Sequence, residues 1–305
     1  MSAPLFRVFF LGAFAFFLSE TTIGVAQTPQ RTIAGIQTLE FLSADGITRL
    51  NVDVYPPHLS DPHATAPPNP PLVVFLHGGG FFAGSRNQPV NQDFCESLSQ
   101  FGICVASMDY RLLQQGRGFH CDISIEEKRT AISAASSDLN SAIQALQQYH
   151  RGALIIAGSS AGAHAVLHAA YFAGLQNVNG VISICGAMEP GCNFPEIPLL
   201  SFHGTCDALV PFGEAEHHFC AKNTPGAMVL QGGGALAKCL PNVELHSYLN
   251  AGHDLSSSVL GDPTSIESCA NFVRRIQAGG NTTGTYLYEG KSTCKLNAPY
   301  LPCQH

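Results

Sequence analysis

Charged residues are scarce in this sequence, and neither sign forms a cluster. Only 12% of the 305 residues are Asp, Glu, Lys or Arg, and the formal net charge is -7. Nucleic-acid binding draws on runs or helix faces rich in Lys and Arg, and the sequence contains neither. Nucleic acid is therefore excluded from the expected partners.

Long apolar runs are missing from the body of the chain, where no stretch reaches the roughly 18 apolar residues of a membrane helix. The N-terminus has MSAPLFR, then the short apolar run VFFLGAFAFFL, then the small-residue site GVA before Gln27. This order is typical of a secretory signal peptide cleaved near Ala26. We expect residues 1–26 to be removed, a secreted or periplasmic product, and no stable membrane insertion afterwards. An uncleaved membrane anchor is the alternative.

The cysteines lack the paired C-x-x-C spacing of a zinc site, although there are 11 of them. In an exported chain, so many cysteines predict disulfides. Proximity in the sequence suggests three pairs: Cys185 with Cys192, Cys220 with Cys239, and Cys294 with Cys303. The odd count leaves at least one thiol, and Cys104 in the apolar run ICVASM is the candidate for a buried one.

Short apolar runs recur along the chain and alternate with helical patterns. After a predicted hairpin of QTLEFLS and TRLNVDVY come LVVFL (72–76), ICVAS (103–107), ALIIA (153–157), VISIC (181–185), LLSFH (199–203) and VELHSYL (243–249). Strands that alternate with helices form a parallel sheet with helices on both faces.

Three segments follow from this pattern: the signal peptide at 1–26, a single α/β domain over 27–278, and an irregular cysteine-containing tail over 279–305. The domain is expected to have a mostly parallel eight-stranded sheet with helices on both faces. Only about a dozen residues separate VISIC from LLSFH, which leaves no room for a large cap domain.

One serine stands between two glycines where a buried strand should turn into a helix. GSSAG, residues 158–162, follows ALIIA and precedes AHAVLHAAYF. This is the context of a nucleophile elbow, in which small residues permit a strained turn that exposes the hydroxyl of Ser160. A serine hydroxyl becomes a good nucleophile only when a base takes its proton, and the base needs a carboxylate to hold its tautomer.

Candidates for the base and the carboxylate follow the ends of later predicted strands. Asp207 lies in HGTCDALVPF just after LLSFH, and His253 lies in LNAGHDL just after VELHSYL. Open α/β sheets build their sites at the carboxyl ends of the strands. We therefore predict that Ser160, Asp207 and His253 form a catalytic triad.

The glycine-rich segment HGGGFFAG follows the strand LVVFL and supplies the remaining part of such a site. Glycines there can turn their N–H groups toward a tetrahedral oxyanion. We predict Gly79, Gly80 and the amide of Ala161 as the donors. His77 is expected to hold the loop rather than to act as a base.

Neighbouring residues are assigned less direct roles. Asp109 and Asp254 are alternative acids, but we expect Asp109 to form a structural pair with Arg111 and Asp254 to cap a loop or helix. Phe81 and Phe82 either line the acyl pocket or anchor the loop.

Two histidine pairs raise the question of a metal. His164 and His168 lie four residues apart on the predicted nucleophile helix, without an evident third ligand. His217 and His218, close to Glu214 and Glu216, are interpreted as a polar helix face. We expect neither a metal nor a cofactor.

Taken together, these motifs resemble the α/β-hydrolase fold carboxylesterases and lipases, particularly the HGGG-type esterases related to hormone-sensitive lipase and the small cap-less esterases. The matching segments are HGGGF, MDYRL, GSSAG, HGTCDALVP and AGHDL, and the resemblance runs from about residue 37 to about residue 276. The resemblance implies Ser160 as nucleophile, Asp207 as orienting acid, His253 as general base and acid, and an acyl-enzyme intermediate. The Trp or Tyr that the family has around the HGGG loop is absent, and the chain contains no Trp at all.

The expected function is that of a secreted serine carboxylesterase that needs no cofactor. Its substrate would be a small-molecule or polymer-linked ester, such as a short acyl ester or an acetyl or feruloyl group on a polysaccharide. One alternative is a prolyl-oligopeptidase-like peptidase or amidase, which shares the elbow and the triad order but carries a propeller domain. The other is a catalytically silent hydrolase-fold binding protein, which commonly loses a triad residue.

Overall fold

The computed structural model describes residues 35–58, 68–191 and 193–290. The predicted signal peptide over 1–26 and the predicted pair of Cys294 with Cys303 lie outside these ranges. None of the helices within them has the length and apolar character that crossing a bilayer requires.

Nine strands form one sheet, in the order β1-β2-β4-β3-β5-β6-β8-β11-β12. Their bounds are β1 Gln37–Leu42, β2 Arg49–Tyr55, β3 Leu72–Leu76, β4 Cys104–Met108, β5 Leu154–Ser159, β6 Gly180–Ile184, β8 Leu199–Gly204, β11 Val243–Leu249 and β12 Gly284–Glu289. From β4 to β12 each strand is parallel to its neighbours, whereas β2 runs antiparallel to both β1 and β4. The predicted opening hairpin and the mostly parallel sheet are thus confirmed.

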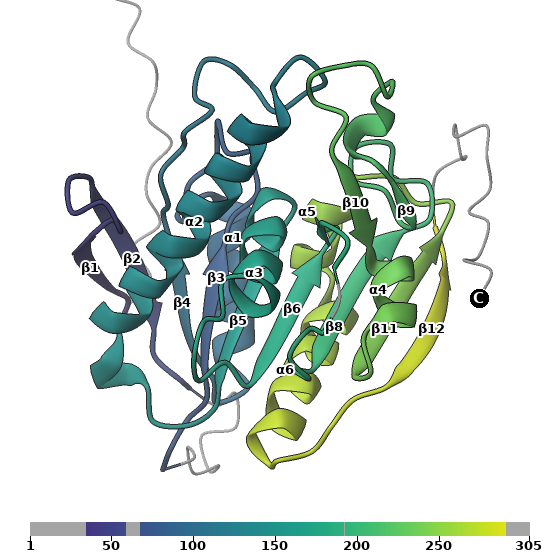
Figure 1. The fold of residues 1–305 in the computed structure, drawn as a ribbon. Helices are drawn as coiled ribbons and strands as arrows, with labels where there is room; N and C mark the ends of the chain where they lie inside the picture. Colours follow the sequence, from purple (N-terminus) through teal and green to yellow (C-terminus); the bar gives the residue numbers. More distant parts are fainter. Residues whose placement is uncertain (1–34, 59–67, 192, 291–305) are drawn as a thin grey trace, which may run out of the picture. The chain divides into compact units, whose positions relative to one another are not determined.

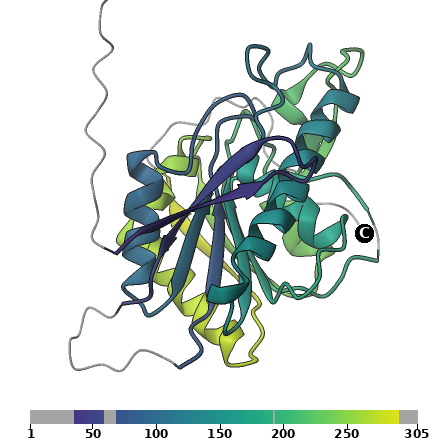
Figure 2. The same ribbon diagram turned by 90° about the vertical axis from the view of Figure 1, so that its left-hand side faces the viewer.

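Helices cover both faces of this sheet (Figures 1 and 2). Their bounds are α1 Pro89–Ser99, α2 Ile125–Ala145, α3 Ala161–Tyr171, α4 Gly233–Cys239, α5 Leu255–Gly261 and α6 Pro263–Gln277. One face carries α2, α3 and α4, and the other carries α1, α5 and α6. Every residue of β3, β4, β5, β6 and β8 is buried. Strands enclosed in this way are continuously apolar, which is why the short apolar runs of the sequence locate them.

The segment between β6 and β8 contains only the two-residue strand β7, Ala187–Met188, in its described part. β7 joins a small second sheet with β10, Val229–Gly232, and β9, Glu214–Glu216. No helical cap interrupts the fold at this point among the described residues, as the sequence predicts.

The prediction of eight strands and of an irregular segment from residue 279 is wrong for residues 284–289. These residues form β12, which pairs in parallel with β11, as Tyr286 opposite His246 shows. β12 is an edge strand whose side chains are mostly exposed. An exposed strand lacks the apolar run by which the buried strands are recognised.

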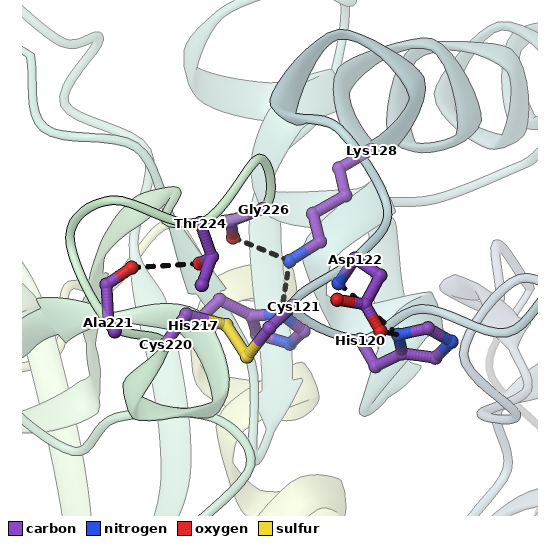
Figure 3. The surroundings of a disulfide bond; sticks show 9 residues. All are labelled: His120, Cys121, Asp122, Lys128, His217, Cys220, Ala221, Thr224 and Gly226. Atoms are coloured by element: carbon purple, nitrogen blue, oxygen red, sulfur yellow. Dashed lines mark hydrogen bonds and ion pairs between the residues drawn. A yellow bond between two sulfur atoms is a disulfide. The ribbon is translucent and has the colours of Figure 1, made fainter.

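The disulfides differ from those that sequence proximity suggests. Cys220 is bonded to Cys121, 99 residues away, and not to Cys239 (Figure 3). Cys185 is a buried free thiol, so it does not bond to Cys192. Cys104 is free and buried as predicted, and burial raises the pKa of its thiol to about 11.

Asp109 and Arg111 do not form the predicted pair. Asp109 accepts a hydrogen bond from Arg86 at 2.6 Å, while the guanidinium of Arg111 reaches the carboxylate of Asp138 on α2 at 2.9 Å. Asp138 is fully buried and also accepts the N–H of Ala44. This carboxylate therefore ties the turn between β1 and β2 to the helix that covers the sheet.

Replacing Asp138 with Asn is expected to lower the free energy of unfolding by about 3 kcal/mol. The amide is neutral, and its NH2 group is a donor where the carboxylate offered Arg111 a second acceptor oxygen. Ser137→Ala is the matched control, since Ser137 is exposed on the same helix and, among the described residues, its hydroxyl bonds only to the Ser133 carbonyl. The control should change stability by less than about 0.5 kcal/mol. Urea unfolding followed by circular dichroism measures both. Equal stability of the two variants would contradict the role given to Asp138.

Candidate active site

Ser160 lies on the turn between β5 and α3, in a backbone conformation that few residues with a side chain adopt. Its φ is 52° and its ψ is -116°. Such strain persists only where the surrounding structure holds it. Here the N–H of Ser160 donates to the carbonyl of Ile184 at 2.8 Å. A Cβ on Gly162 would lie 2.1 Å from the carbonyl oxygen of Leu76, so only glycine lets α3 start this close to β3.

A continuous chain of hydrogen bonds joins the three predicted triad residues. The Oγ of Ser160 lies 2.8 Å from Nε2 of His253, and Nδ1 of His253 lies 2.6 Å from Oδ2 of Asp207. A carboxylate accepts only, so Nδ1 carries the ring proton and Nε2 is free to accept the serine proton. Asp207, rather than Asp109 or Asp254, is the acid that contacts His253.

The carboxylate of Asp207 is fully buried, and both of its oxygens have partners. Oδ2 accepts from His253, and Oδ1 accepts the N–H groups of Leu209 and Val210, each at 2.9 Å. Burial alone would raise the pKa of Asp207, but the hydrogen bond and charge of His253 and the other donors outweigh it and lower the pKa below its ordinary value. The acid is thus held ionised while it orients the histidine.

His203 holds the loop that follows Asp207 through hydrogen bonds of its ring, and sequence analysis did not identify it. Nε2 of His203 lies 3.1 Å from the carbonyl of Val210, and its Nδ1 accepts the N–H of Gly233 at 3.1 Å. These partners set one neutral tautomer, and burial lowers the pKa of the ring. The signal in the sequence was its place at the end of the strand LLSFH, four residues before Asp207.

The three predicted oxyanion donors line the same cavity as Ser160. This cavity has a volume of about 510 Å³ and is bordered by Gly79, Gly80 and Ala161. None of their N–H groups donates to another described residue. Gly79 has a φ of +115° and lies in a tight turn. The turn is closed by the N–H of Ala83, which donates to the Gly79 carbonyl at 3.0 Å.

His77 and Phe81 hold this loop from the inside. Nδ1 of His77 lies 2.7 Å from the carbonyl of Gly78, and the ring stacks on Tyr110 at 4.4 Å between centroids. Phe81 is fully buried, Phe82 is 41% exposed, and both line the cavity.

Comparisons with known proteins identify similar sequences and similar folds. The family model BD-FAE matches residues 53–189, which include the glycine loop and Ser160. The chain is similar to the 3-O-acetylpapaveroxine carboxylesterases CXE1 and CXE2 of Papaver somniferum, at 24% identity over 205 residues and 23% over 197 residues. The alignments cover 61% and 56% of this chain, and 64% and 61% of the two relatives. The chain thus spans less than two thirds of the length of these relatives.

Solved structures show the same fold. Esterase 2 of Thermogutta terrifontis, with propionate bound, has a TM-score of 0.54 at 19% identity over 80% of this chain and 95% of that one. The form of that esterase phosphoramylated by tabun has a TM-score of 0.54 at 18% identity, over 82% of this chain and 98% of that one. The chain therefore has the α/β-hydrolase fold and is similar in sequence to carboxylesterases.

One thiol, that of Cys185, lies beside Asp207 and His253. Among the described residues, one group of three side chains has the spacing of possible metal ligands, with all three ligand atoms within 4.8 Å of one another: Cys185, Asp207 and His253. Two of them, Asp207 and His253, are hydrogen-bonded to each other. Burial raises the pKa of Cys185 well above its ordinary value and keeps the thiol protonated.

Sequence reasoning was wrong about the positions of His217 and His218. These residues do not form a polar helix face: they follow β9 in a short 3-10 turn, and His217 is buried. Both rings line the cavity that contains Ser160. His164, from the other histidine pair, lines the cavity as well. The spacing of the histidines along the sequence does not predict that these residues line one cavity.

We expect Gly79→Ala to lower the free energy of unfolding by about 3 kcal/mol or more. The new Cβ would lie 2.1 Å from the Ala83 carbonyl oxygen, which adds a steric clash to the roughly 1 kcal/mol of left-handed backbone strain. Gly116→Ala is the matched control, because Gly116 has φ of +78° and its Cβ would meet nothing within 4 Å. Thermal and urea unfolding measure both. A Gly79 variant as stable as the control would rule out the close turn described here.

Proposed function

We propose that this hydrolase cleaves carboxylic esters through a covalent acyl-enzyme on Ser160. The observation that carries the proposal is the unbroken hydrogen-bond chain from Ser160 through His253 to Asp207, placed beside a cavity that also presents unengaged N–H groups. A binding protein that had lost catalysis would have no need of this alignment. The names of the similar carboxylesterases support the same reaction class.

Acylation follows from the positions of these groups. Oγ of Ser160 attacks the ester carbonyl carbon while its proton passes to Nε2 of His253, and the N–H groups of Gly79, Gly80 and Ala161 stabilise the oxyanion. When the intermediate collapses, the bond to the alcohol oxygen breaks and His253 gives its proton to that oxygen. Loss of one oxyanion donor typically costs about 3 kcal/mol of transition-state stabilisation.

Deacylation repeats the sequence with water. A water molecule gives a proton to Nε2 of His253 and attacks the acyl carbon, and the returning proton goes to Oγ of Ser160 as the carboxylic acid leaves. Asp207 remains an ionised acceptor throughout and stabilises the protonated ring of His253. The low pKa of Asp207 supports this role.

The proposed substrates are short or medium acyl esters, or acetyl or feruloyl groups carried by a polysaccharide. Support comes from the absence of a cap between β6 and β8 among the described residues, because a site without a cap can accept an ester displayed on a larger molecule. The cavity of about 510 Å³ is of the size that holds a small ligand.

Secretion is proposed from two independent features. The first 26 residues have the order of a signal peptide, and the bond between Cys121 and Cys220 is a disulfide. Disulfides persist in oxidising compartments such as the periplasm and the extracellular space.

The triad is tested by Asp207→Asn alongside Ser160→Ala, with p-nitrophenyl esters from acetate to palmitate as substrates. Asn in place of Asp207 should reduce kcat by about 10⁴-fold, because the neutral amide no longer selects the required tautomer of His253. Ser160→Ala should abolish turnover of every ester. Asp254→Asn is the control, since this neighbouring carboxylate does not contact His253, and it should keep most of the activity. Comparable activity of Asp207→Asn and Asp254→Asn would contradict the assigned acid.

Export is tested by expressing residues 1–305 in a secreting host and sequencing the N-terminus of the product. The expected mature chain starts at Gln27, because GVA supplies the small residues that signal peptidase requires. Gly24→Arg with Ala26→Arg should block this cleavage. An unprocessed chain retained in the membrane fraction would overturn the proposal of a secreted product.

A further inference from the structure

Lys128 on α2 is a buried cation without an acidic partner. Its side chain is fully buried, and no ion pair joins it to an Asp or Glu among the described residues. Its Nζ donates to the carbonyl of Gly226 at 2.7 Å and lies 3.4 Å from Nδ1 of His217 (Figure 3). Burial lowers the pKa of Lys128 to about 8, so the ammonium form is still the main one at neutral pH.

Lys128 determines which nitrogen of His217 carries the proton. An ammonium group only donates, so Nδ1 of His217 accepts from it and Nε2 is the N–H of the ring. Burial lowers the pKa of His217 well below its ordinary value, and the nearby His164, His218 and Lys128 lower it further. His217 is therefore neutral, with one N–H donor of defined position.

The ring of His217 belongs to a wall of histidines in the Ser160 cavity. His120, His217 and His218 all line that cavity, whereas no Asp or Glu side chain from the described ranges lines it. The disulfide between Cys121 and Cys220 ties the segment of His120 to that of the other two (Figure 3). Three histidines thus line a cavity that no described carboxylate lines. The ammonium group of Lys128 lies behind His217, and the carboxylate of Asp122 lies 3.4 Å from Nδ1 of His120.

This histidine wall lies close to the reacting atoms. The ring of His217 packs edge-on against that of His164 at 5.7 Å between centroids, and His164 follows Ser160 by one helical turn. On the other side, the N–H of His218 donates to the carbonyl of Leu209 in the Asp207 loop at 2.8 Å. A substituent of an ester bound at Ser160 can therefore reach the wall.

We propose that the histidine wall of His120, His217 and His218, backed by Lys128, is a subsite for a carboxylate carried by the ester substrate. This inference rests on the proposed ester hydrolysis and specifies its substrate class: esters that bear a free carboxylate a short chain or one ring away from the scissile bond. A carboxylate bound there accepts a hydrogen bond from Nε2 of His217 and brings a negative charge toward Lys128, which has no acidic partner among the described residues. Charge-assisted bonds of this kind are about twice as strong as neutral ones.

The test compares matched pairs of esters on the wild type. On the alcohol side the pair is 4-acetoxybenzoate and phenyl acetate, and on the acyl side it is monophenyl glutarate and phenyl pentanoate. We expect kcat/KM for the carboxylate ester to exceed that of its neutral partner about tenfold or more in at least one pair. 4-Acetoxybenzyl alcohol carries a neutral hydroxyl in place of the carboxylate, and its kcat/KM should stay close to that of phenyl acetate. The subsite would be overturned if the carboxylate and neutral esters had similar kcat/KM in both pairs, or if 4-acetoxybenzyl alcohol were favoured as strongly as 4-acetoxybenzoate.

Variants assign the effect to residues. His217→Phe keeps the ring packing but removes the donor, and Lys128→Met removes the charge, so each should lower the carboxylate-to-neutral ratio about tenfold. His217→Gln retains an N–H donor and should recover part of the ratio. Within each variant, turnover of the neutral ester shows that the triad is assembled. A high ratio that His217→Phe leaves unchanged would contradict the assignment.

Binding without turnover separates the subsite from the proposed reaction. Titration calorimetry with benzoate and glutarate should detect binding to Ser160→Ala, weakened about tenfold by an added His217→Phe, while benzyl alcohol binds both equally. Carboxylate binding with no hydrolysis of any ester by the wild type would defeat ester hydrolysis but not the subsite. Hydrolysis of neutral esters with no carboxylate binding would defeat the subsite alone.

Discussion

A buried, ionised carboxylate is the constraint on which the site depends. Asp207 is removed from water at the end of β8, and a charge in that position is tolerated only when donors surround it. The N–H groups of Leu209 and Val210 and the ring of His253 supply them. The same bonds that satisfy the charge hold the loop after β8 and turn Nε2 of His253 toward Ser160. The stability of this region and its chemistry therefore rest on one group.

The sheet brings the partners of that carboxylate together. Ser160, Asp207 and His253 follow β5, β8 and β11, whose carboxyl ends lie at the same edge because these strands are parallel. Glycine at the start of α3 permits the close approach that exposes Ser160, and the glycine loop after β3 completes the cavity. The histidine wall, whose two segments are joined by the disulfide between Cys121 and Cys220, lines another part of that cavity.

Local motifs made most of this predictable from the sequence, because an elbow, a glycine loop and strand-end residues each have a signature within about ten residues. Features that depend on distant contacts were not predictable. Cys121 and Cys220 are 99 residues apart, and Lys128 meets His217 only through the fold. β12 was missed for a different reason, since an exposed edge strand has no buried face to pattern its sequence. The pairing of Arg111 with Asp138 shows likewise that proximity along the chain is a poor guide to ion pairs.

The most direct test of the central claim is covalent labelling of the mature chain with a fluorophosphonate probe, followed by peptide mass spectrometry. An activated serine at the elbow should take up one probe per chain, located at Ser160, and uptake should be lost on denaturation in urea before labelling. Labelling that depends on the folded protein and maps to Ser160 is the predicted result. A chain that stays unlabelled, or that is labelled at another residue, would contradict the account of Ser160 as a nucleophile activated by His253 and Asp207.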